Sequence, residues 1–77
     1  MLLVDCRGLS CPEPVIKTRR VLEVNPEESV TALVDGPTPR DNLLVMAEKL
    51  GRQVSWEEAP PAGYRVIIGP ASRPAAA

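Results

Sequence analysis

The chain contains no histidine and no phenylalanine, and Trp56 and Tyr64 are its only aromatic residues. Histidine is the side chain that most often moves protons near neutral pH, so its absence excludes the common histidine-based catalytic sites. Of the two cysteines, Cys6 and Cys11, the best remaining candidate for chemistry is Cys11. With 77 residues and so few aromatic rings, the chain predicts one small domain with an aliphatic core.

Excess charge and long apolar runs are also missing. Nine basic residues nearly balance ten acidic ones, and the net charge of −1 argues against nucleic-acid binding driven by overall charge. No apolar run approaches the roughly 20 residues that cross a bilayer, and the first residues carry no visible secretory signal. We therefore expect a cytoplasmic protein with reduced thiols that binds neither nucleic acid nor membranes directly.

The spacing of apolar residues, prolines and glycines predicts six elements. In chain order these are a strand at 2–6, a helix at 12–24, a strand at 29–35, a helix at 39–50, and strands at 53–57 and 64–68. This order predicts an α/β (α+β) two-layer sandwich, in which both helices cover one face of a mixed four-stranded sheet. Residues 1–69 would form the domain, and the Pro/Ala-rich residues 70–77 a disordered tail.

Proline marks both predicted helix starts. Pro12 would take the first helical position and Pro14 would lie in the first turn, because proline lacks an N–H that has no partner there. In the second helix, Thr38 would be the N-cap, Pro39 the first helical residue and Asp41 the capping-box partner.

The first predicted helix is amphipathic. Val15, Ile16 and Leu22 would form its apolar face. Its polar side carries three basic residues, Lys17, Arg19 and Arg20. These residues would either form a solvated surface or dock an acidic partner.

Cys11 stands directly before this helix, where unpaired N–H groups and the helix dipole stabilise an anion. Arg7 in the preceding loop would add a positive charge, whereas Glu13 would oppose it. We expect a moderate lowering of the pKa of the Cys11 thiol, which increases the share of nucleophilic thiolate. Pro12 and Pro14 would hold the junction in one shape, but they also fit a plain helix start with Cys11 as a small filler.

Cys6 ends the first predicted strand, on the same face as Leu2 and Val4. It would be buried there as a small apolar residue, or it would act as a resolving thiol for Cys11 if the two Cα atoms lie within about 7 Å. Two cysteines without histidine are too few for a disulfide framework or a complete zinc site. We therefore expect no metal and no cofactor.

The loops that follow the first two strands are predicted neighbours. Parallel strands place their carboxyl ends at one edge of the sheet, where ligand sites of open α/β sheets gather. The loops at 8–11 and 35–40 should therefore lie side by side. Arg40 would be a second cation near the Cys11 sulfur, or simply a solvated side chain, while Asp35 and Asp41 would serve as strand-end and cap residues.

The run Gly-Leu-Ser-Cys-Pro-Glu-Pro at 8–14 contains the signature Gly-Leu-x-Cys-Pro-x-Pro, and the chain resembles the TusA/SirA-like sulfur-carrier family. The resemblance extends from residue 2 to about residue 68. Residues 15–18 and the Asn42 region are closer to the YedF-like branch, whereas Arg40 and Asp41 are similar to the Arg-Asp pair of TusA proper. Cys6 departs from the family pattern, in which a non-cysteine residue is common.

The resemblance implies a sulfurtransferase that works as a persulfide carrier. Cys11 would accept sulfane sulfur from a cysteine desulfurase or a rhodanese-like donor and pass it to a thiol of an acceptor protein in a sulfur relay. The other residues of the site would support Cys11; they are Arg7, Gly8, Pro12, Glu13, Pro14 and Arg40. Such relays serve tRNA thiolation, cofactor synthesis or sulfur oxidation, and selenium metabolism by analogy with the YedF-like branch.

Two other functions stay open from the sequence. A non-catalytic interaction domain would dock an acidic partner through the basic first helix, without chemistry at Cys11. A thiol redox sensor would instead form a disulfide between Cys6 and Cys11.

Overall fold

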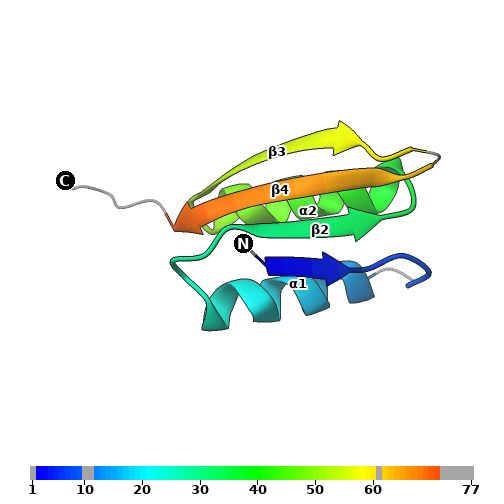
Figure 1. Ribbon diagram of the computed structural model, residues 1–77. Coiled ribbons are helices and arrows are strands. Elements are labelled where there is room, and N and C mark those ends of the chain that lie inside the picture. The colour runs from blue at the N-terminus through cyan, green and yellow to red at the C-terminus, as the bar shows by residue number, and fades with distance from the viewer. Residues whose placement is uncertain (1, 10–11, 61, 72–77) are drawn as a thin grey trace.

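The computed structural model describes residues 2–9, 12–60 and 62–71, and its elements follow the predicted order (Figure 1). They are β1 (Leu2–Asp5), α1 (Glu13–Val24), β2 (Val30–Val34), α2 (Pro37–Lys49), β3 (Arg52–Glu58) and β4 (Tyr64–Ala71). Neither helix within the described ranges has the length and apolar character that a membrane crossing requires.

The strands form one mixed sheet in the order β1-β2-β4-β3. β1 and β2 run parallel, since α1 connects them as a crossover, whereas β4 is antiparallel to both β2 and β3. Both helices cover the same face of the sheet (Figure 1), which confirms the predicted two-layer sandwich.

The core lies between the sheet and the two helices and is aliphatic. The paired residues Val4, Ala32 and Val66 cross the sheet from β1 to β4 and are at most 5% exposed. Leu22 of α1 and Leu43 of α2 belong to the same buried cluster. Aliphatic side chains therefore fill most of the space between the layers, together with Cys6, Met46 and Thr18, as the scarcity of aromatic residues required.

α1 buries part of the predicted apolar face. Leu22 is buried as predicted and Val15 packs against the core, but Ile16 does not belong to this face. Pro14, Thr18 and Leu22 are buried, and their spacing of four residues places them on one face of the helix. Ile16 is 56% exposed, so its assignment to the apolar face is wrong. A threonine takes the central position of the buried stripe, which is why the apolar pattern alone misplaced the face.

The start of α1 also differs slightly from the prediction. Pro12 is the N-cap and Glu13 the first helical residue, so Pro12 does not take the first helical position. The Pro12 carbonyl accepts the first helical bond from the N–H of Ile16 at 3.1 Å. Pro14 lies in the first turn as predicted, because its missing N–H would have no partner there.

α2 begins two residues earlier than predicted. Gly36 is the N-cap and Pro37 the first helical residue, so the predicted roles of Thr38 and Pro39 are wrong. Pro37 already satisfies the preference for proline at the first position, and the cap makes no side-chain hydrogen bond. The predicted capping box with Asp41 is therefore absent from α2.

β4 continues through Pro70 and Ala71, two residues past the predicted domain boundary. β2 pairs with β4 only as far as Ile68, so the missing N–H of Pro70 disturbs no bond on that side. On the other side, the pairing with β3 shifts register between Arg52 and Val54. The remaining residues of the predicted tail, 72–77, lie outside the described residues.

Candidate functional site

The β1–α1 loop, the β2–α2 loop and the β3–β4 hairpin lie at the same end of the sheet (Figure 1). The Gly8 N–H donates a hydrogen bond to the Asp35 carboxylate, which ties the first loop to the second. The Cys6 N–H donates to the Leu33 carbonyl at 2.9 Å and extends the pairing of β1 with β2. The predicted proximity of these two loops is therefore confirmed for the part of the first loop that the structure describes.

The first described part of the loop is a tight turn. The Leu9 N–H donates to the Cys6 carbonyl at 3.3 Å, and Gly8 has a φ of 80°, which glycine adopts without strain. Cys11, the predicted nucleophile, lies outside the described residues, as does Ser10. The structure describes both flanks of this pair: Leu9 is exposed on one side and Pro12 on the other.

The start of α1 offers backbone donors at this edge. Its N-cap is a proline, which has no side-chain acceptor, and no side-chain cap bond forms there. Pro14 has no N–H, and the Ile16 N–H is bonded to the Pro12 carbonyl. The first-turn donors without a side-chain cap are therefore the N–H groups of Glu13 and Val15. An anion placed at this end would be stabilised by these donors and by the helix dipole. Glu13, also in the first turn, is exposed and adds a negative charge nearby.

Arg7 is bound to a carboxylate rather than free. Its Nε and Nη2 donate to the two Asp5 carboxylate oxygens, each at 2.9 Å. This hydrogen bonding lowers the pKa of Asp5 from 3.8 to about 2 and raises the pKa of Arg7. The positive charge that was expected to favour the Cys11 thiolate is thus largely balanced by its own neighbour.

Arg40 is also paired, and it faces the hairpin. Its guanidinium contacts the Asp41 carboxylate at 2.8 Å and lies over the rings of Trp56 and Tyr64, 4.3 and 4.7 Å from their centroids. The two rings meet edge to face at 5.4 Å. Arg40 therefore joins the start of α2 to β3 and β4, a cation–π contact that the sequence analysis missed. The one feature of the sequence that could have indicated this contact is the presence of Trp56 and Tyr64 on two strands that were predicted to pair.

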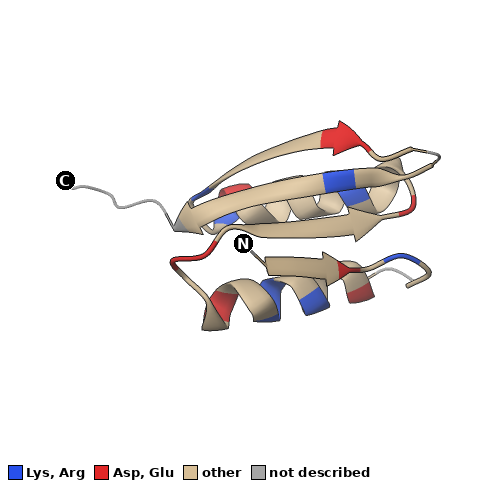
Figure 2. Ribbon diagram, in the orientation of Figure 1, with Lys and Arg blue, Asp and Glu red and all other residues tan. Residues whose placement is uncertain are grey.

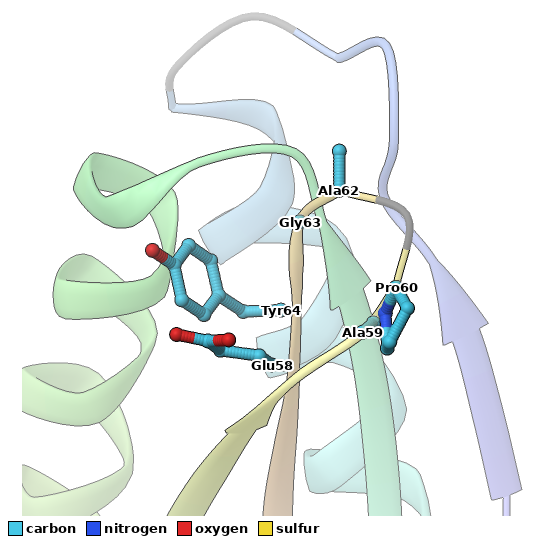
Figure 3. Close-up of a pocket in the computed structure, with 6 residues that line it drawn as sticks. All are labelled: Glu58, Ala59, Pro60, Ala62, Gly63 and Tyr64. Carbon is cyan, nitrogen blue, oxygen red and sulfur yellow. The ribbon is translucent and has the colours of Figure 1, made fainter.

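A hollow of about 320 Å³ lies at the hairpin beside this stack. Figure 3 shows the Glu58 carboxylate and the Tyr64 ring directed to the same side, toward α2. The described lining includes no thiol and one ionisable carboxylate, so this hollow offers nothing to a thiol-based reaction.

Cys6 is buried, as the first of its two predicted roles requires. It is 2% exposed, and its Sγ lies 3.5 Å from Thr18 Oγ1 and 3.9 Å from the Pro14 carbonyl oxygen. The thiol thus packs against α1 inside the core. Its distance to Cys11 falls outside the described residues, so the role of a resolving thiol stays a prediction.

The basic residues of α1 do not share one surface. Figure 2 shows positive charges along the middle of α1, with acidic residues nearer its two ends. Lys17 Nζ donates to the Asp5 carbonyl at 3.1 Å, and Lys17 and Arg20 line one hollow beside the helix. Arg19 pairs with Glu23 at 3.1 Å and lines a separate groove between α1 and α2. A partner that binds all three basic residues would therefore have to contact both sides of α1, one with Lys17 and Arg20 and the other with Arg19.

Metal chemistry has no support in the described ranges, where no group of three or more Cys, Asp or Glu residues could hold an ion.

Comparison with known proteins decides the family. The family model described as "Sulfurtransferase TusA" matches residues 3–69, which contain both helices, β2 and β3 and most of β1 and β4. The chain belongs to the TusA family. The family resemblance read from the motif at 8–14 is thereby confirmed, and membership places the chain among sulfur carriers.

Relatives of this TusA-family protein carry names that agree with the family. A protein of Archaeoglobus fulgidus named "Putative sulfur carrier protein" is 34% identical over 70 residues, which cover 88% of this chain and 91% of the relative. A protein of Thermotoga maritima with the same name is 31% identical over 67 residues, covering 84% and 85%. Neither comparison specifies the YedF-like branch, which stays a prediction.

A solved structure confirms the fold of the TusA-family chain. The crystal structure of the SirA-like protein from Desulfitobacterium hafniense has a TM-score of 0.85 and 35% sequence identity. The match covers 94% of this chain and 100% of that protein. The two-layer sandwich is therefore the fold of this family.

Proposed function

We propose that Cys11 carries sulfane sulfur as a persulfide and relays it to a thiol of an acceptor protein. The observation that carries the proposal is the start of α1, which follows Cys11 in the chain and has no side-chain cap. A persulfide is anionic at neutral pH when its pKa is low, and open N–H groups at a helix start stabilise anions. The exposure of Leu9 and Pro12, the nearest described residues before and after Cys11, supports the proposal.

The transfer needs no oxidant and no histidine. The Cys11 thiolate attacks the terminal sulfur of a donor persulfide, a new S–S bond forms, and the donor cysteine leaves as a thiolate. In the second half, an acceptor thiolate attacks the terminal sulfur on Cys11, and Cys11 leaves as a thiolate. The chain thus acts as a sulfurtransferase only together with its two partner proteins.

The proposed donor is a cysteine desulfurase or a rhodanese-like protein, and the acceptor is another protein of a sulfur relay. Lys17, Arg19 and Arg20 would supply basic contacts for these partners. A cytoplasmic setting, in which thiols stay reduced, suits this chemistry. The route served by the relay, for example tRNA thiolation, is a further prediction of the family resemblance.

Intact mass tests the proposal. After incubation with a cysteine desulfurase and cysteine, the protein should gain one sulfur atom that a reductant removes. Cys11→Ser should abolish the gain, whereas Cys6→Ser should keep it, because the Cys6 thiol is buried against Thr18. Absence of the gain with both a desulfurase and a rhodanese-like donor would sink the proposal.

A thiol redox sensor is less well supported. A disulfide between Cys6 and Cys11 would require Cys6 Sγ to leave its contacts with Thr18 and the Pro14 carbonyl. Mild oxidation should therefore leave both thiols open to separate alkylation after unfolding.

A further inference from the structure

A groove of about 570 Å³ lies between α1 and α2. Its walls are mainly apolar, with Val15 from α1 and Val45 and Met46 from α2. Leu50, directly after α2, extends the apolar wall. Val45 is 50% exposed and Leu50 36% exposed, so the groove leaves apolar surface open to solvent between the helices.

The groove begins next to the proposed sulfur site. Pro12, the residue that follows Cys11 in the chain, lines one end. Both helices start at the loop edge of the sheet and run away from it (Figure 1), so the groove leads from this edge toward the opposite end of the molecule. A chain segment lying in the groove would therefore have one end beside Pro12, the residue that follows Cys11 in the chain.

The far end of the groove carries two basic side chains. Arg19 of α1 and Lys49 in the last turn of α2 line it, and no carboxylate does so among the described residues. Arg19 also pairs with Glu23, but both side chains are more than half exposed, and a guanidinium has further N–H donors to offer. The other hollow beside α1 differs, because Glu13 lines it together with Lys17 and Arg20.

The distance between the Pro12 end and the basic end of the groove determines how far apart the cysteine and the carboxylates of a bound segment must be. Pro12 and Arg19 are seven residues apart along α1, which corresponds to about 10 Å of helix. An extended segment covers that distance in about three residues. A cysteine held at the Pro12 end would thus place the residues three or four positions further along at the basic end.

We propose that this groove binds the segment of the sulfur-exchange partner that flanks the partner's own reactive cysteine. The segment has apolar residues next to the cysteine and carboxylates three to four residues away. The apolar residues would cover Val15 and Val45, and the carboxylates would meet Arg19 and Lys49. This inference rests on the proposed function, which supplies the exchange between Cys11 and a partner thiol.

Thiol–disulfide exchange with short peptides tests the groove without any persulfide. The probes are Cys-Leu-Val-Glu-Glu and Cys-Leu-Val-Lys-Lys, each supplied as a mixed disulfide with 2-mercaptoethanol. The Cys11 thiolate attacks the peptide sulfur, the protein–peptide disulfide forms, and 2-mercaptoethanol leaves as a thiolate. Intact mass at equilibrium gives the yield of each adduct, and digestion confirms that the adduct is on Cys11.

The acidic peptide should give about fivefold more adduct than the basic one at low salt, as two exposed ion pairs allow. The preference should weaken in high salt. Lys49→Glu should remove most of it, and Arg19→Glu combined with Lys49→Glu should reverse it. Arg65→Glu changes the net charge as much as Lys49→Glu does, but it lies on β4 and lines none of the groove, so it should keep the preference.

Three results would overturn the groove proposal. They are equal yields for the two peptides, an equal loss with Arg65→Glu, and a loss with Arg20→Glu as large as with Lys49→Glu. Circular dichroism confirms that each variant is folded. A protein that gains a persulfide but shows no peptide preference refutes the groove alone, whereas one that shows the preference but gains no persulfide refutes the carrier function.

Discussion

At the scale of single residues, Gly63 has the strictest requirement among the described glycines. It has a φ of 93°, and a Cβ at this position would collide with the Val34 carbonyl oxygen. The hairpin can therefore approach the end of β2 only with glycine at this position.

Gly63→Ala should destabilise the fold by about 3 kcal/mol, because strain at positive φ adds to a backbone clash. Gly51→Ala is the matched control, since Gly51 has a φ of 74° but open space around it. It should cost only about 1 kcal/mol. Urea unfolding followed by Trp56 fluorescence measures both, and similar losses for the two variants would contradict the clash.

The Asp5–Arg7 pair makes a second prediction at this scale. The pKa of Asp5 falls from 3.8 to about 2 because Arg7 donates hydrogen bonds to the carboxylate. A carboxylate with a lowered pKa stabilises the fold above its ordinary pKa, and this contribution disappears as the pH falls through the lowered value. The contribution of Asp5 is thus complete above about pH 4 and lost toward pH 2.

A carbon-detected NMR titration of the Asp5 carboxyl should give a midpoint near 2. In Arg7→Gln the midpoint should return toward 3.8, and the acid unfolding transition should move to higher pH. An unchanged midpoint in Arg7→Gln would show that the pair is not formed in solution.

At the scale of elements, Arg52 connects three segments at the end of the molecule opposite the loops. Its side chain is buried, and it donates to the carbonyl oxygens of Gly69 at 2.8 Å, Glu28 at 2.9 Å and Leu22 at 3.3 Å. Burial lowers the pKa of Arg52, which stays charged because its ordinary pKa is so high. The end of α1, the loop before β2 and the end of β4 thus share one guanidinium.

Arg52→Lys should destabilise the fold by about 2 kcal/mol, because one ammonium cannot reach all three carbonyls and leaves buried acceptors unpaired. Arg65→Lys is the matched control, since Arg65 makes a partly exposed pair with Glu57. It should cost less than about 1 kcal/mol. Urea unfolding compares the two, and equal costs would show that the buried bonds of Arg52 contribute little.

At the scale of the whole molecule, one core joins the N-terminal strand to the C-terminal hairpin. Cys6 lies beside β1 in that core, and Trp56 lies on β3 at the other edge of the sheet. A domain of this size is expected to unfold in one cooperative step. Two probes at opposite edges of the sheet should therefore report the same transition.

In a Cys11→Ser variant, alkylation of Cys6 should occur over the same urea range as the change in Trp56 fluorescence. The reason is that Cys6 is 2% exposed and becomes accessible only when the core opens. Alkylation well below the fluorescence transition would reveal a separate opening of β1 and α1.

Much of the fold could be predicted because its signals are local. Short apolar runs and proline or glycine breaks identified all six elements, and the crossover rule placed β1 parallel to β2. The errors concern helix phase and helix starts. Thr18 is polar yet buried, and two prolines near the start of α2 offered two positions for its first residue.

The sequence identified the motif of the candidate site, but it did not predict the ion pairs around that site. The sequence placed Arg7 in the right loop, whereas Arg40, expected in the loop at 35–40, lies in the first turn of α2. The sequence analysis did not anticipate that Arg7 would bind Asp5 or that Arg40 would bind Asp41. Whether each guanidinium binds a neighbouring carboxylate or stays available to the Cys11 sulfur depends on the direction of its side chain. Those directions are fixed only when the strands and loops are packed.

The sequence by itself determined the order of the elements, the family motif and the absence of histidine. These features depend on composition and on residues near one another in the chain. The tertiary structure alone decided the burial of Arg52, the stacking of Arg40 on the hairpin and the groove between α1 and α2. Each of these joins segments far apart in the sequence, and such contacts follow from packing distances that no local pattern encodes.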